Sequence, residues 1–131
     1  MPISSSINLG AKLVLTRCGG LMASSDFDHY MAEVWSHNDY FGFNELFYTG
    51  EGNWSGFEFN QVLDVAAKSA RLIRFKPNSK FAFVVSIGIQ EELCKFYTAA
   101  KSLKQGQFRE IRLFTTEIEA MDWLQGATLI E

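Results

Sequence analysis

The sequence predicts a single α/β domain in which about four helices pack on a mostly parallel or mixed sheet of about four to five strands. Its 131 residues, with 47% hydrophobic and 21% charged side chains, are typical of one globular domain. Short apolar runs alternate along the chain with segments whose apolar residues repeat at helical spacing, which is typical of strands joined by right-handed helical connections. No linker or repeat interrupts this order, so we expect one domain over residues 1–131.

The first two strands are predicted near the N-terminus. Residues 12–18 (KLVLTRC) have the composition of a strand, and Gly19 and Gly20 predict a turn that closes it. We expect this strand to be central in the sheet. Residues 3–9 are predicted to pair with it in the antiparallel sense, through a turn near Gly10.

A helix is predicted next, with Ser24 or Ser25 as its N-cap. Its apolar residues fall three or four positions apart and form one stripe that would face the core. The residues of this stripe are Phe27, Tyr30, Met31, Val34 and Trp35.

The rest of the chain alternates strands and helices bounded by capping and glycine signals. Residues 45–49 predict a short strand, with an irregular loop after it at Gly50, Gly52 and Gly56. The almost continuously apolar residues 81–86 predict a strand in the middle of the sheet, covered on both faces. The other predicted elements are a helix from Asn60 to about Arg74, a helix from about 89 to 104 stopped by Gly106, a strand around Ile111 and Leu113, and a helix between Thr116 and Gly126.

Charge and composition exclude several classes of function. With 12 basic and 15 acidic residues the net charge is −3, which argues against general binding of nucleic acid. No apolar run is long enough for a membrane span, and we expect a cytoplasmic protein. Cys18 and Cys94 are expected to be reduced and buried. His29 and His37 are too far apart for a metal site at helical spacing, and no metal or cofactor is expected. The sequence shows no nucleophile paired with a general base, so no enzyme activity is expected.

Four segments resemble the SpoIIAA-like family, which is related to the STAS domains of anti-sigma factor antagonists and to lipid-binding domains of the Sec14 type. The segments are 13–21 (LVLTRCGGL), 41–46 (FGFNEL), 80–85 (KFAFVV) and 113–114 with 119–124 (LF and EAMDWL). The resemblance spans about residues 10–125 and is a pattern of apolar and glycine positions. It implies a STAS/SpoIIAA-like fold and a non-enzymatic regulatory or protein-interaction domain.

The sequence departs from the anti-sigma antagonists at their phosphorylation site. Those regulators carry an Asp-Ser pair just after a central strand, and the matching residues 48–56 (YTGEGNWSG) have no such pair. Thr49 and Ser55 remain as weak candidates for a phosphate acceptor. A phosphate there would be repelled by Glu51 and Glu58.

The segment 40–59 is unusually rich in aromatic residues, interleaved with glycines. We expect Phe47 in the core, and three uses are open for the other rings: a homodimer surface, the wall of an apolar pocket, or a cover for the sheet edge. Because Trp54 follows a polar, glycine-rich stretch, we expect it on a recognition surface and not in the core. The candidate binding residues are Tyr40, Tyr48, Trp54, Phe57, Arg71 and Arg74.

Two classes of function follow from these observations. The preferred hypothesis is an interaction module that meets a second copy or another protein through the aromatic segment. The alternative is a carrier or sensor of a small apolar or lipid-like ligand, with aromatic walls and with Arg71 or Arg74 for an anionic head group. Both rest on analogy of fold.

Overall fold

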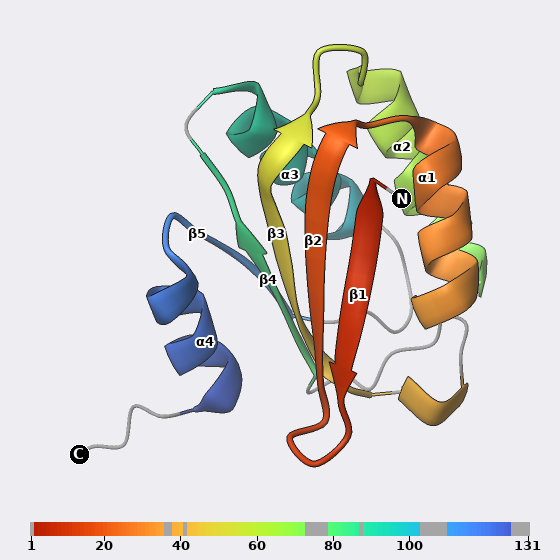
Figure 1. Cartoon of the computed structure of the whole chain (residues 1–131). Coiled ribbons are helices and arrows are strands. Elements are labelled where there is room, and N and C mark those ends of the chain that lie inside the picture. The colour runs from red at the N-terminus through yellow and green to blue at the C-terminus, as the bar shows by residue number, and fades with distance from the viewer. Residues whose placement is uncertain are drawn as a thin grey trace.

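The computed structural model describes residues 2–35, 38–40, 42–72, 79–86, 88–102 and 110–126. They form an α/β domain around one five-stranded sheet, with the strands side by side in chain order (Figure 1). β1 pairs with β2 in the antiparallel sense, and every later pair is parallel, so the predicted α/β class is confirmed. The strands are β1 (Ile3–Asn8), β2 (Leu13–Leu21), β3 (Asn44–Asn53), β4 (Lys80–Val84) and β5 (Glu110–Phe114).

Helices cover both faces of this sheet. Because the parallel strands follow one another in order and right-handed connections return on the same side, the three helices between them share one face. The last helix follows β5 and lies on the other face (Figure 1). The helices are α1 (Ser24–Tyr30), the π-helical turn η1 (Met31–Trp35), the short 3₁₀ turn η2 (Asn38–Tyr40), α2 (Phe59–Leu72), α3 (Ile89–Ser102) and α4 (Glu117–Gln125).

Two apolar cores result, one on each face. Along β4, Phe81 and Phe83 point into the larger core under α1, α2 and α3, whereas Ala82 and Val84 point into the smaller core under α4. This confirms the strand covered on both faces that the apolar run predicts. The predicted stripe of the first helix is confirmed as well, because its residues pack in the larger core.

The helix ends follow the capping signals in part. Thr116 caps α4, with its Oγ1 accepting the Glu119 N–H at 3.3 Å, and Gly126 ends that helix at a φ of 62°. The expectation that Ser24 or Ser25 caps α1 is wrong. The N-cap is Ala23, whose N–H donates to the Asp26 carboxylate at 2.9 Å. The predicted ends near Arg74 and Gly106 lie outside the described residues, as does His37.

Two predicted breaks are continuous strand. β2 runs through Gly19 and Gly20, and β3 runs through Gly50 to Asn53, so the expected turn is wrong and the expected loop is wrong at Gly50 and Gly52, whereas Gly56 does lie in a turn. The two extensions pair with each other, Gly20 with Gly52, beyond a register shift that follows Arg17. Glycine in a strand often marks such a bulge or a close approach of another group.

Gly52 shows why a side chain is excluded there. A Cβ at this position would lie 2.8 Å from Trp54 Nε1 and 3.2 Å from both Cys18 Cβ and Met22 Cγ, in a packed core. We expect Gly52→Ala to lower the free energy of unfolding by about 1–3 kcal/mol, as overpacking does. Gly19→Ala is the matched control, since its Cβ would meet nothing within 4 Å. Equal effects of the two substitutions in urea unfolding would contradict this packing.

Candidate functional site

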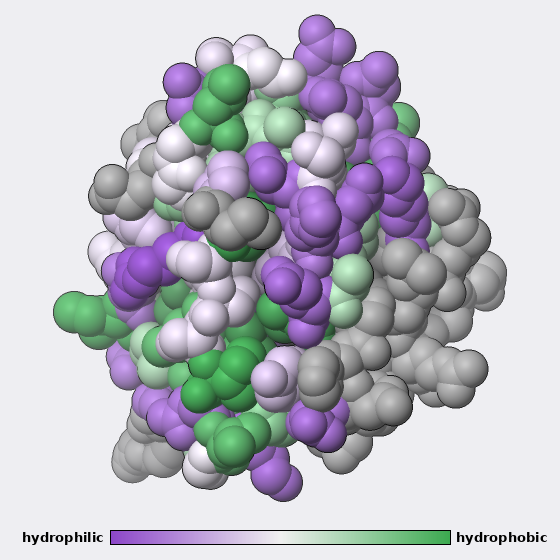
Figure 2. Space-filling model, turned by 45° about the vertical axis from the view of Figure 1, so that its right-hand side comes forward, coloured by the Kyte–Doolittle hydropathy of each residue, from purple (hydrophilic) through white to green (hydrophobic). Residues whose placement is uncertain are grey.

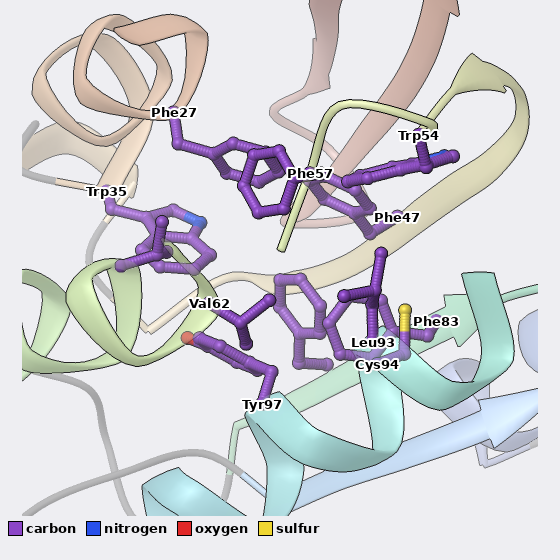
Figure 3. Close-up of a pocket in the computed structure, with 12 residues that line it drawn as sticks. Phe27, Trp35, Phe47, Trp54, Phe57, Val62, Phe83, Leu93, Cys94 and Tyr97 are labelled. Carbon is purple, nitrogen blue, oxygen red and sulfur yellow. The ribbon is translucent and has the colours of Figure 1, made fainter. Parts of the chain in front are cut away.

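The main core contains a cavity of about 40 Å³ between the sheet and helices α1, α2 and α3 (Figure 3). Its lining is entirely apolar, and eight of the twelve lining residues are aromatic. The lining residues are Phe27, Trp35, Phe47, Trp54, Phe57, Val62, Val65, Phe81, Phe83, Leu93, Cys94 and Tyr97.

The sheet and the helices contribute different walls to this cavity. Alternation along β3 and β4 turns Phe47, Phe81 and Phe83 to one face of the sheet. The Phe83 ring lies edge-to-face against Phe47 at 5.6 Å and against Tyr97 at 5.9 Å between ring centroids. The sheet and α3 therefore meet through aromatic contacts of the favoured geometry.

Trp54 belongs to this cavity, so its predicted place on a recognition surface is wrong. The side chain is only 7% exposed, and its ring lies 6.0 Å from Phe27 and 5.4 Å from Phe57. Its Nε1 donates to the Thr49 carbonyl at 3.2 Å. Because β3 extends to Asn53, the residue after it is held by a strand and not by an open loop. Phe57 is buried beside it.

The candidates Tyr40 and Tyr48 are not brought to the cavity with Trp54. Tyr48 points to the opposite face of the sheet, with the Arg17 guanidinium 5.1 Å from its ring. Tyr40 is partly buried against the main core and contacts Phe43, at 5.8 Å between centroids. Arg71 lies in α2, and Arg74 lies outside the described residues. Among the candidates whose side chains the structure describes, only Trp54 and Phe57 line the cavity.

The two candidate phosphate acceptors differ in exposure. Thr49 is fully buried, and its hydroxyl donates to the Val84 carbonyl at 2.9 Å and lies 2.8 Å from the Gln90 side-chain amide. The expectation of Thr49 as an acceptor is therefore wrong for the folded protein, since a kinase cannot reach it. Ser55 is exposed and stays a prediction.

A buried polar cluster next to the cavity was missed from the sequence. Glu45 of β3 is fully buried, and its carboxylate accepts hydrogen bonds from Thr16 Oγ1 at 2.6 Å, from Trp35 Nε1 at 2.8 Å and from the Tyr30 hydroxyl. The Ser5 and Thr16 hydroxyls lie 2.8 Å apart and extend the cluster to β1. Such hydrogen bonds offset the cost of burying a carboxylate. Alternation with Phe47 was the one sequence signal that Glu45 faces the core.

Both cysteines are free and buried, as expected. Burial raises the pKa of the Cys18 thiol to about 12, and the negative charges of Glu45 and Asp26 add to this effect. Burial also raises the pKa of the Cys94 thiol. Neither group has the lowered pKa of a reactive thiol.

Thiol labelling tests this assignment. At pH 8 we expect Ellman's reagent to modify Cys18 and Cys94 slowly in the native protein and fast in denaturant, because the thiolate is the reacting form and both side chains are covered. Rapid native modification of both would contradict the burial. Raising the pH from 8 to 9 should accelerate the slow native reaction of Cys18 by about tenfold, because its thiolate fraction is far from saturation, whereas a free thiol with a pKa of about 8.5 accelerates by only about threefold.

The fold and the cavity together define an α/β domain with an aromatic cavity in its main core. No family model matches the chain, and the searches of curated proteins and of solved structures find no match either. Among the described residues no helix is long and apolar enough to cross a membrane. The same residues contain no cluster of His, Cys, Asp and Glu suited to a metal ion.

Proposed function

We propose that this protein is a non-enzymatic domain of the SpoIIAA-like type that binds a small apolar molecule in the aromatic cavity. One observation carries the proposal: a pocket of about 40 Å³ with a wholly apolar lining lies in the main core between the sheet and the helices. Protein interiors are normally packed as densely as organic crystals. Apolar cavities stay dry and take up apolar ligands.

The position of the aromatic residues supports a pocket over a homodimer surface. Trp54 and Phe57 face inward, so the segment that suggested a docking surface supplies cavity walls instead. Over the face in Figure 2, hydrophobic residues form small separate groups among hydrophilic ones. Of the exposed large hydrophobic residues, Phe59 and Leu63 lie one turn apart on α2 and the others lie elsewhere in the fold, which is ordinary for a protein surface. Among the described residues they are Leu9, Leu21, Phe59, Leu63 and Ile118. The interaction module stays a prediction.

The chemistry of the lining supports binding without catalysis. Among the described lining residues only Cys94 and Tyr97 are titratable, and burial keeps the Cys94 thiol protonated. No carboxylate or histidine faces the void from these residues. General acid–base or nucleophilic catalysis needs such a group within hydrogen-bond reach of the substrate.

The volume sets the size of the ligand. The void is smaller than the ~150 Å³ of an engineered cavity that takes benzene. A single ring therefore enters when the aliphatic side chains of Val62, Val65 and Leu93 shift. Each apolar Å² that the ligand removes from water contributes roughly 25 cal/mol, so burial of apolar surface is the main source of the binding free energy.

Tryptophan fluorescence tests this proposal. Of the three tryptophans, Trp35 and Trp54 line the cavity, whereas Trp123 packs in the smaller core on the other face of the sheet. In a Trp123→Phe background, the emission therefore reports on the cavity alone. We expect benzene to change this emission saturably and to raise the melting temperature, since a ligand that binds only the folded state stabilises it.

Cavity filling provides the matched control. Val62→Ile adds a methylene group at the cavity, whereas Val34→Ile adds one at a buried position outside its lining. We expect Val62→Ile to weaken benzene binding and Val34→Ile to leave it unchanged, with folding of both checked by urea unfolding. A linear, unsaturable response to benzene, or equal binding by the two variants, would refute the proposal.

A further inference from the structure

Trp35 connects the cavity to the buried carboxylate of Glu45. Its indole ring lines the void (Figure 3), and its Nε1 donates to Glu45 Oε1 at 2.8 Å. The same ring lies edge-to-face against Phe81, at 5.7 Å between centroids. Trp35 ends the π-helical turn η1, a backbone form that is rare and occurs frequently at functional sites.

The carboxylate that accepts this hydrogen bond is itself firmly placed. Glu45 lies in an interior strand, where its backbone pairs with Val14 on β2 and with Phe81 on β4. Thr16 and Tyr30 donate to the same carboxylate from β2 and α1. Because a group with several hydrogen bonds on a central strand has little freedom, the Trp35 ring is held at one position.

The aliphatic part of the lining has no comparable anchor. It consists of Val62 and Val65 on α2 and of Leu93 on α3, whose aliphatic side chains have no polar atoms. A ligand therefore displaces these side chains before it displaces Trp35. The fixed wall then decides which shapes fit.

The walls also define the chemistry of the ligand. The Trp35 N–H is given to Glu45 and the Trp54 N–H to the Thr49 carbonyl, so neither indole donates into the void. A polar or charged ligand would lose its hydration without compensation from these groups. An aromatic ring gains edge-to-face contacts with the surrounding rings, which a saturated ring of similar size does not make.

We propose that Glu45 is a positioning residue that holds Trp35 as the fixed wall of the cavity, and that this wall selects a single uncharged aromatic ring. The inference rests on the proposed function of the cavity and names its ligand class. In this proposal the buried Glu45 carboxylate influences which ligand binds, although it does not touch the ligand.

The test compares dissociation constants for benzene, cyclohexane and naphthalene, measured by ligand-observed NMR. For the unmodified protein we expect cyclohexane to bind about tenfold more weakly than benzene, the factor that corresponds to the loss of aromatic contacts. Naphthalene should bind at least as weakly as cyclohexane. Trp35→Phe replaces the wall by a smaller ring and should strengthen the binding of naphthalene relative to benzene by about tenfold.

Two variants at position 45 separate positioning from a general structural role. Glu45→Gln keeps an oxygen that accepts the Trp35 N–H and should retain the selectivity of the unmodified protein. Glu45→Leu removes the acceptor and should shift selectivity in the same direction as Trp35→Phe. Where Glu45→Leu fails to fold, Trp35→Phe and Glu45→Gln still decide the question.

The outcomes distinguish the two proposals. If benzene does not bind the unmodified protein, the proposed function fails and this inference fails with it. If benzene binds but Trp35→Phe leaves the three constants in their original ratios, only the present inference is overturned. A loss of selectivity in folded Glu45→Gln as large as in Trp35→Phe would likewise overturn the positioning role.

Discussion

Replacing Trp54 by alanine is expected to lower the free energy of unfolding by about 3–5 kcal/mol, the usual cost of truncating a buried ring. The indole is buried among Phe27, Phe57 and the rest of the cavity lining. Its removal would also leave the Thr49 carbonyl without the indole N–H. A buried acceptor that loses its partner adds to the cost.

Urea unfolding measures this effect, and Ser55→Ala is the control. Ser55 is the next residue along the chain and is exposed, so its substitution should change stability by no more than about 0.5 kcal/mol. A change below about 1 kcal/mol for Trp54→Ala would place the ring at the surface and contradict the structure.

Phe83→Ala is expected to cost about as much, roughly 3–5 kcal/mol, because the ring lies between the sheet and α3. Its centroid is 4.8 Å from Phe81 on the same strand and 5.6 Å from Phe47 on the neighbouring strand β3. Because backbone pairing fixes β3 against β4, these rings cannot close the gap. The substitution would therefore enlarge a void that already exists.

The matched control for this prediction is Phe59→Ala on α2. Phe59 is 45% exposed, although it contacts Phe96, and its truncation should cost clearly less. Both variants are compared by the midpoint of urea unfolding at constant m-value. A midpoint for Phe83→Ala no lower than that for Phe59→Ala would show that β4 is not in the centre of the core.

Local signals explain the elements that were predicted correctly. The apolar run that became β4 and the Thr116 cap of α4 each depend on a few neighbouring residues. The alternation of strands and helices then limits the topology, since right-handed connections between parallel strands leave few arrangements. The mostly parallel sheet and the two-sided burial of β4 follow from these rules, whereas the order of the strands was not predicted.

The candidate site was less accessible from the sequence because long-range pairing builds it. Gly20 and Gly52 are residue types typical of turns, yet they pair with each other although 32 positions separate them in the chain. This pairing extends β3 to Asn53, next to Trp54. The donors to Glu45 come from β2, α1 and η1, and no spacing near position 45 indicates them. The sequence showed that the aromatic segment is unusual, but it did not show that Trp54 and Phe57 face the core.

A crystal structure of the protein under xenon pressure tests the central claim most directly, because xenon enters dry apolar cavities without needing a polar contact. We predict one ordered xenon atom in the main core, between Phe83 of β4, Val62 of α2 and Leu93 of α3. A xenon-pressurised crystal with no density at that position, or with xenon bound only elsewhere, would contradict the account.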